Sequence, residues 1–264
     1  MKGIIDFHTH AFPDDLSERV IRMLEEEGGI NAYLDGKVSS LLSSMDACGI
    51  EKSVICNIAT KPSQYDPILQ WCMKVRSERI IPFPSFHPYD PEFSKRIDEI
   101  KHAGFKGIKF HPYYQSFTID EERLLPVYEK ICEENLILVM HTGFDFAFKR
   151  IRIADPEKII TVINKFPSLK LVTTHLGAWE QWEEVQQFLL GKPIYMEISF
   201  SLEFLNDTVK NIILNHPPEY ILFGTDSPWT EQPKTLSLLK GLRLGEEKER
   251  LILRENALKL LDSV

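Results

Sequence analysis

The sequence predicts an α/β fold, a closed (β/α)8 barrel, and three features of the chain support this prediction. Short apolar, β-rich runs alternate with helical patterns along the 264 residues. That alternation indicates parallel strands joined by right-handed crossovers. Eight such runs occur, which is the number that closes a barrel, and polar residues follow several of them, where the active sites of barrels lie.

The predicted strands are short runs of mostly aliphatic residues. They begin near residues 3, 53, 80, 107, 136, 170, 194 and 220. An open, doubly wound sheet is the alternative arrangement. No G-x-G-x-x-G motif follows the first strand, so a dinucleotide site has little support.

The first helix is predicted over residues 13–27. It begins with Pro-Asp-Asp, carries Leu16, Val20 and Leu24 at helical spacing, and ends at Gly28-Gly29, which are typical helix signals. Similar signals predict helices over residues 38–47, 64–76, 93–102, 121–134, 156–166, 178–190, 205–215 and 246–261. The last of these is expected to pack against the barrel wall.

The composition is that of an ordinary soluble protein, with 43% hydrophobic and 27% charged residues. It allows a substantial core, and we expect one domain over residues 1–264. The formal charge is −8, from 31 Lys and Arg against 39 Asp and Glu. Because binding to phosphates needs a basic surface, nucleic acid is an improbable partner.

The four cysteines show neither C-x-x-C spacing nor a dense framework. They are therefore expected to be reduced thiols without a redox role. The N-terminus lacks the long apolar region of a signal peptide, and no stretch is long enough to cross a bilayer. We expect a soluble, cytoplasmic protein.

Two histidines, His8 and His10, end the first predicted strand. Strand alternation would put both on one face together with Asp6, while Phe7 and Thr9 point to the other face. Imidazole is a common metal ligand whose second nitrogen needs a polar partner, so Asp6 could orient one of the rings. The pair alone is weak evidence for a metal, because many such pairs are surface or hydrogen-bonded histidines.

Polar residues also follow four later strands. They are Lys109 and His111 after the fourth, His141 after the fifth, His175 after the sixth and Asp226 after the eighth. Imidazole and carboxylate groups converging on one rim provide donors for Zn²⁺ or a similar divalent ion, with a position left open for water or substrate. Such an ion yields hydroxide at neutral pH, which favours a hydrolase.

With these motifs, the chain resembles the amidohydrolase superfamily of metal-dependent TIM barrels. The resemblance extends to the amidohydrolase-related branch, which contains aminocarboxymuconate-semialdehyde decarboxylase, resorcylate-type decarboxylases and lactonases. The matching segments, in family order, are Asp6-Phe7-His8-Thr9-His10, Gly107-Ile108-Lys109-Phe110-His111-Pro112, His141-Thr142-Gly143, Thr174-His175-Leu176-Gly177, Gly224-Thr225-Asp226-Ser227-Pro228-Trp229 and Glu255-Asn256-Ala257. The set is specific to the branch but not to a substrate.

The resemblance implies one catalytic divalent ion, most often zinc, bound by His8, His10, His141 and Asp226. It implies that His175 is the general acid or base, and that Asp226 serves as a ligand, as the proton acceptor from metal-bound water, or as both in turn. In binuclear relatives a strand-four lysine is carboxylated and bridges two ions. Lys109 is followed by Phe-His-Pro as in the single-metal branch, so we interpret it as a structural or substrate-facing lysine.

Two reactions are compatible with the resemblance. Metal-activated hydrolysis of an amide, lactone or ester is the leading prediction, and non-oxidative decarboxylation of a small unsaturated or aromatic acid is the alternative. The second reaction needs a cation near the rim, for which Lys61, Arg150 and Arg152 are candidates. Solvated surface charge is the favoured interpretation of all three, and Lys61 is the most suggestive of them. A non-catalytic metal-binding barrel is a third hypothesis, because fold alone does not imply chemistry.

The loops after the strands are rich in aromatic residues, which suit a small cyclic or aromatic substrate. The residues predicted to contact it are Lys61, Lys109, His111, Tyr113, Phe144 and Trp229. Tyr114 and residues 144–148 belong to the same aromatic segments. The sequence does not determine the oligomeric state, and a homodimer is one of the alternatives.

Overall fold

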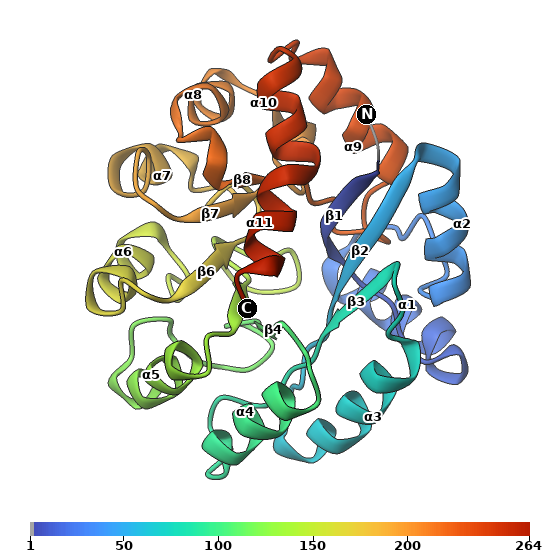
Figure 1. The fold of residues 1–264 in the computed structure, drawn as a ribbon, viewed down its shortest axis with the longest axis vertical. Helices are drawn as coiled ribbons and strands as arrows, with labels where there is room; N and C mark the ends of the chain where they lie inside the picture. The colour runs from blue at the N-terminus through green and yellow to red at the C-terminus, as the bar shows by residue number, and fades with distance from the viewer. Residues whose placement is uncertain (1–2) are drawn as a thin grey trace.

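The computed structural model describes residues 3–264 and shows eight parallel strands, each followed by at least one helix (Figure 1). The strands are β1 (Ile4–Thr9), β2 (Ile50–Cys56), β3 (Ile80–Phe83), β4 (Gly107–Phe110), β5 (Ile137–Met140), β6 (Lys170–Thr173), β7 (Tyr195–Glu197) and β8 (Ile221–Leu222). All eight predicted strands exist. The largest difference in a start position is at β2, predicted near residue 53 and observed at Ile50.

Hydrogen bonds between neighbouring strands close the barrel. β1 to β3 pair in sequence order, and so do β4 to β8. The two groups are joined where Lys109 N donates to Pro84 O at 3.1 Å and where Phe7 N donates to Phe223 O at 2.8 Å. The (β/α)8 prediction is therefore confirmed, and the open doubly wound sheet is excluded.

Most of the helices form a ring around the strands (Figure 1). They are α1 (Asp14–Gly28), α2 (Val38–Cys48), α3 (Tyr65–Val75), α4 (Phe93–His102), α5 (Leu125–Glu133), α6 (Pro156–Lys165), α7 (Trp182–Phe188), α8 (Asp207–Asn215), α9 (Gln232–Gly241), α10 (Glu246–Arg250) and α11 (Asn256–Asp262). Among these described helices, none combines the length and the apolar character needed to cross a membrane.

Several helical segments differ from the prediction, including α5, which begins at Leu125 instead of residue 121 and follows a 3₁₀ turn, Glu122–Leu124. α9 was not predicted, because its apolar residues lie close together instead of at regular helical spacing. α7 begins at Trp182 instead of residue 178, since Glu180 has a positive φ of 57° that an α-helix cannot contain. The predicted C-terminal helix is interrupted by a π-helical turn, Leu251–Glu255.

Side chains from most strands fill the inside of the barrel. This cluster includes Ile5 and Phe7 of β1, and it continues with Val54, Cys56, Phe83, Ile137, Val139, Val172, Leu222, Ala257, Leu260 and Leu261. The last three belong to α11, which lies across one end of the barrel (Figure 1). A closed bottom and a packed interior leave the opposite end, where the strands finish, for a functional site.

A long connection between β1 and α2 carries α1 beside that opposite end. Two backbone hydrogen bonds fix the connection: Phe12 N donates to Gly36 O, and Tyr33 N donates to Pro228 O, both at 2.8 Å. Pro228 lies in the loop after β8. The connection is thus tied to the rim of the barrel, and α1 forms one wall above it.

Candidate metal centre and active site

A β-bulge near the end of β1 places the two histidines. Asp6 pairs with Ser53 and Thr9 pairs with Ile55, so β1 carries one more residue than β2 between these pairs. Such an extra residue interrupts the alternation of side chains. Phe7 therefore packs inside the barrel, while His8 and His10 both reach the cavity at its end.

Asp6 does not orient an imidazole, so that part of the sequence prediction is wrong. Its carboxylate accepts hydrogen bonds from Thr225 N at 3.0 Å, Thr225 Oγ1 at 2.6 Å and Gln232 Nε2 at 2.8 Å. Burial raises the pKa of Asp6 to about 7. Asp6 instead ties β1 to the loop that carries Asp226.

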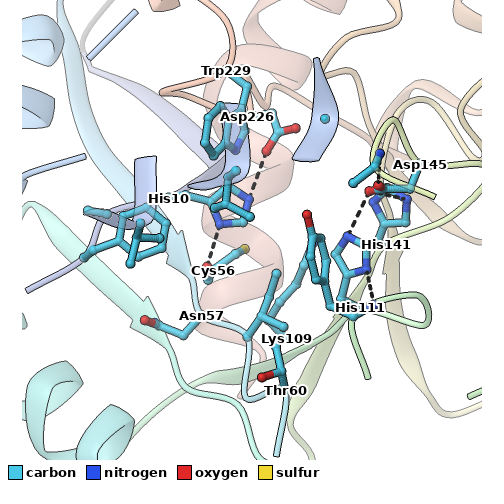
Figure 2. Close-up of a pocket in the computed structure, with 18 of the residues that line it drawn as sticks. His10, Cys56, Asn57, Thr60, Lys109, His111, His141, Asp145, Asp226 and Trp229 are labelled. Atoms are coloured by element: carbon cyan, nitrogen blue, oxygen red, sulfur yellow. Dashed lines mark hydrogen bonds and ion pairs between the residues drawn. The ribbon is translucent and has the colours of Figure 1, made fainter. Parts of the chain in front are cut away.

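The hydrogen-bond partners of His8 and His10 fix where their protons lie. His8 Nδ1 faces the carboxylate of Glu197 at 3.0 Å. His10 Nδ1 faces the backbone oxygen of Cys56 at 2.8 Å (Figure 2). These oxygens accept hydrogen bonds, so each Nδ1 carries the proton. Burial also lowers the pKa of His8 well below its usual range, which keeps that ring neutral. Each Nε2 therefore offers a lone pair.

The two lone pairs converge with a carboxylate oxygen. His8 Nε2 and His10 Nε2 lie 3.2 Å apart, and Asp226 Oδ1 lies 3.3 Å from the first and 2.9 Å from the second. Asp226 Oδ1 is buried and has no hydrogen-bond partner among the described residues. Three electron-pair donors without a proton between them repel one another, and a cation among them removes that cost. This donor set fits a divalent metal ion.

His141 and His175 face each other at the same end of the barrel. His141 Nε2 donates to Phe144 O at 2.9 Å, so its Nδ1 has the lone pair, and that atom lies 3.2 Å from His175 Nε2. His175 Nδ1 lies 3.0 Å from Ser199 Oγ. His175 and Asp226 both have positive φ angles, 56° and 61°, a strained conformation that is common at functional sites.

His141 is not grouped with the other three predicted ligands. Among the described residues, His8, His10 and Asp226 bring donor atoms within 4.8 Å of one another, and His111, His141 and Asp145 form a second such group. His141 stacks on His111 with ring centroids 4.0 Å apart, and both rings lie beside Asp145 (Figure 2). A role for His141 as fourth ligand, through Nδ1, remains a proposal.

Lys109 lies inside the donor cluster. Its side chain is about 1% exposed, and its Nζ is 3.2 Å from His8 Nε2. The other three candidate cations lie elsewhere: Lys61 is exposed and does not line the cavity, Arg150 pairs with Glu180, and Arg152 pairs with Glu184 at 2.6 Å. Of the lysines and arginines in residues 3–264, Lys109 is the one that lines the cavity.

The cavity above these residues has a volume of about 390 Å³. Of the residues predicted to contact a substrate, Lys109, His111, Phe144 and Trp229 line it. Tyr113 does not, because it is buried behind the wall, where its hydroxyl donates to Ile151 O at 2.7 Å. The neighbouring Tyr114 lines the cavity instead.

A family model described as amidohydrolase matches residues 5–262. The chain belongs to the amidohydrolase family. The relationship to this family covers almost all of the barrel, including every candidate ligand. No curated protein sequence matches the chain.

Solved structures share the fold over nearly the full length of both chains. An uncharacterised TIM-barrel protein, Bb4693 from Bordetella bronchiseptica, has a TM-score of 0.81 and 19% identity, with 99% of each chain covered. Dihydroxybenzoic acid decarboxylase from Polaromonas sp. JS666, with bound manganese and 2-nitroresorcinol, has a TM-score of 0.75 and 15% identity, with 99% of this chain and 97% of that chain covered.

Other similar structures carry related names. 5-Carboxyvanillate decarboxylase LigW from Sphingomonas paucimobilis has a TM-score of 0.73 and 13% identity, with 99% of each chain covered. Further matches are named 2,6-dihydroxybenzoate decarboxylase and, in one case, probable 2-pyrone-4,6-dicarboxylic acid hydrolase. At these identities the likeness establishes the fold of this amidohydrolase and not its reaction.

Sequence reasoning missed Glu197, the carboxylate that organises the site of this amidohydrolase. Glu197 ends β7 and is fully buried. It accepts hydrogen bonds from His8 Nδ1, Ser199 Oγ and His175 N, between 2.8 and 3.0 Å. A Cβ on Gly224 would collide with this carboxylate, so Gly224 provides the space for it. The signal was present, because Glu197 is an acidic residue inside an apolar run.

Proposed function

We propose that this amidohydrolase is a metal-dependent decarboxylase that removes a carboxyl group from a small aromatic or unsaturated acid. The observation that carries the proposal is the ammonium group of Lys109, buried beside His8 in a largely apolar cavity. Such a cation is the partner that a substrate carboxylate needs there. The names of the similar structures support this alternative better than the hydrolysis that the sequence favoured.

The metal is part of the proposal. His8, His10 and Asp226 would hold the ion, with His141 Nδ1 as the fourth protein ligand. A bound divalent ion supplies a Lewis acid for an oxygen of the substrate. Similar structures contain manganese, whereas zinc is the metal that the sequence predicts, and both belong in the test.

Each residue of the site would then have a separate role in the reaction. Lys109 binds the carboxylate, and the aromatic walls orient the ring and exclude water. His175 delivers a proton from Nε2 to the carbon that bears the carboxyl group, while Ser199 holds its Nδ1. The bond to the carboxyl carbon breaks, its electron pair stays with the ring, and CO2 leaves. One proton thus replaces one CO2, and His175 regains a proton from solvent.

Hydrolysis is the second candidate, because the same donor set could hold a water for attack on a lactone or amide. One similar structure is named as a probable pyrone dicarboxylic acid hydrolase. The two reactions differ in their products, which makes them easy to separate.

The test uses protein loaded with Mn²⁺ or Zn²⁺ and two panels of compounds, hydroxylated benzoic acids and lactones or cyclic amides. We expect CO2 release from one or more acids, and in D2O one deuterium on the carbon that carried the carboxyl group. Ring opening of a lactone without CO2 release would instead establish a hydrolase. A fully metal-loaded protein that turns over neither panel would support the non-catalytic hypothesis.

A further inference from the structure

The cavity extends well past the candidate metal centre, and its far part is apolar. We call this part the distal wall. It consists of Leu16, Val20, Met23 and Leu24 of α1 together with Ile58, Ile68 and Trp71. The cavity is continuous from His8, His10 and Asp226 to these residues. If a substrate is held at the metal centre by its reacting group, the substituent opposite that group would therefore contact the distal wall.

α1 presents an apolar stripe to this cavity. Leu16, Val20, Met23 and Leu24 follow the spacing of a helical face, which normally packs on a protein core. Here Ser17 and Ile21 are the buried residues of the helix, and Met23 stays 46% exposed. Within residues 3–264 the stripe thus lines a cavity instead of packing on a protein core, an arrangement that costs free energy unless an apolar ligand fills the cavity.

The distal wall is fixed in place. The connection that carries α1 is hydrogen-bonded to Pro228 through Tyr33 N. At the end of α1, Gly28 lies against Phe146 of the loop after β5, since a Cβ on Gly28 would be 3.7 Å from Phe146 Cβ. The wall is therefore a preformed surface, which favours binding because little of it must be ordered.

The volume of the cavity exceeds what a single ring needs. An apolar cavity of roughly 150 Å³ holds benzene, whereas this cavity measures about 390 Å³. The remainder is enough for a further apolar group of several carbons. An unsubstituted benzoic acid would leave the distal wall in contact with water.

The charges in the cavity exclude a second acid group at the far end. Among the described residues that line the cavity, Lys109 is the one that is a lysine or an arginine, and it lies at the metal centre. Asp145, the charged residue of the aromatic loop after β5 that lines the cavity, is an acid. A second carboxylate on the substrate would be desolvated without a cation beside it, which is strongly unfavourable.

From these observations we infer that the substrate is a monocarboxylic aromatic or unsaturated acid with an extended apolar substituent opposite its carboxylate, bound along the distal wall. The inference rests on the proposed function for the position of the carboxylate. It differs from the dicarboxylic compounds named for similar structures, which are 5-carboxyvanillate and 2-pyrone-4,6-dicarboxylic acid. The apolar stripe of α1 would select the substituent.

Calorimetry with the metal-loaded protein tests the inference independently of turnover. The probes are 4-alkyl-2-hydroxybenzoates with chains from methyl to hexyl, and a benzene dicarboxylate as the contrasting acid. We expect Kd to fall about fourfold for each added methylene until the cavity is full, from the transfer free energy of a buried methylene. Affinity that is independent of chain length, or tighter binding of the dicarboxylate, would overturn the inference.

A pair of variants locates the effect. Val20→Trp fills the distal wall and should abolish the gain in affinity per methylene. Met73→Trp is the matched control, because Met73 is exposed on α3 and does not line the cavity. If both variants keep the wild-type dependence on chain length, the inference is wrong. Thermal unfolding of each variant checks that it is folded. If Val20→Trp does not fold, the dependence of wild-type Kd on chain length still tests the inference.

Turnover of the same compounds separates this inference from the proposed function. Chain-length-dependent binding without CO2 release would support the apolar ligand and reject the decarboxylase. Release of CO2 from acids with short alkyl chains, together with Kd values that do not depend on chain length, would support the decarboxylase and reject the apolar substituent. Each result therefore bears on one of the two proposals.

Discussion

At the scale of single residues, the positions of protons decide what the site can bind. Each Nδ1 of His8 and His10 donates to an oxygen behind it, so both Nε2 lone pairs point toward Asp226. Glu197 is the negatively charged partner in this arrangement, and it also holds Ser199. A carboxylate behind a ligand imidazole fixes its tautomer and strengthens it as a donor.

Glu197→Gln should therefore weaken metal binding. The amide is neutral and a poorer acceptor for His8 Nδ1, so we expect metal affinity to fall about 10- to 100-fold. Competition with a chromophoric chelator measures this change. Glu184→Gln is the control, because Glu184 pairs with Arg152 away from the cavity. Equal affinities in wild type and Glu197→Gln would show that the carboxylate does not support the ligand.

His175→Asn separates a proton carrier from a ligand. His175 Nε2 faces the cavity and its Nδ1 is held by Ser199, so the variant should keep its metal and lose about 10²- to 10⁴-fold in kcat. Metal analysis and turnover are measured on the same preparation. Loss of the metal instead would identify His175 as a ligand.

At the scale of elements, the loops after β5 and β6 are locked together, and this positions two walls of the cavity. Trp179 N donates to Thr142 O at 3.0 Å, and Phe144 N donates to Trp179 O at 3.1 Å. Gly143 lies between these bonds with a φ of 86°, and a Cβ there would overlap the backbone of Trp179. The close approach requires glycine.

Gly143→Ala tests this close approach. Gly191→Ala is a matched control, because Gly191 has a similar φ of 80° but open space around its Cα. The control should cost about 1–2 kcal/mol of unfolding free energy from backbone strain alone. Gly143→Ala should cost about 1–3 kcal/mol more from overpacking, measured by urea unfolding. Equal losses for the two variants would argue against a locked contact.

The elements also show where sequence reasoning works and where it stops. Buried parallel strands are continuous apolar runs, so all eight could be located. The bulge in β1 could not, because one inserted residue leaves no mark in the hydrophobic pattern, and strict alternation then misassigned Asp6. The missing part of α7 depends on the φ of Glu180, which tertiary contacts set.

At the scale of the whole molecule, the barrel brings residues from distant parts of the chain to one rim. This is why the candidate site was largely predictable: residues at the ends of parallel strands must lie close together. The topology does not specify to which of the two neighbouring donor groups each side chain contributes its donor atom. That division depends on local partners, such as the Phe144 oxygen that accepts a hydrogen bond from His141 Nε2.

This division predicts the number of ions per chain. The second donor group, His111, His141 and Asp145, would need the Nε2 lone pair of His141, but that atom carries the proton that it donates to Phe144 O. In the group of His8, His10 and Asp226, neither Nε2 atom carries a proton, and the hydrogen bond that His8 Nε2 accepts comes from Lys109 Nζ. We expect metal analysis to find about one ion per chain.

Two isosteric variants assign that ion to its site. Asp226→Asn should remove the metal and abolish the rise in Tm that the ion produces in the wild type, since a bound ligand stabilises the native state in proportion to its affinity. Asp145→Asn should keep both, because its carboxylate lies outside the converging donors. Two ions in the wild type, with one lost in Asp145→Asn, would mean that His141 releases the Phe144 oxygen and that the centre is binuclear.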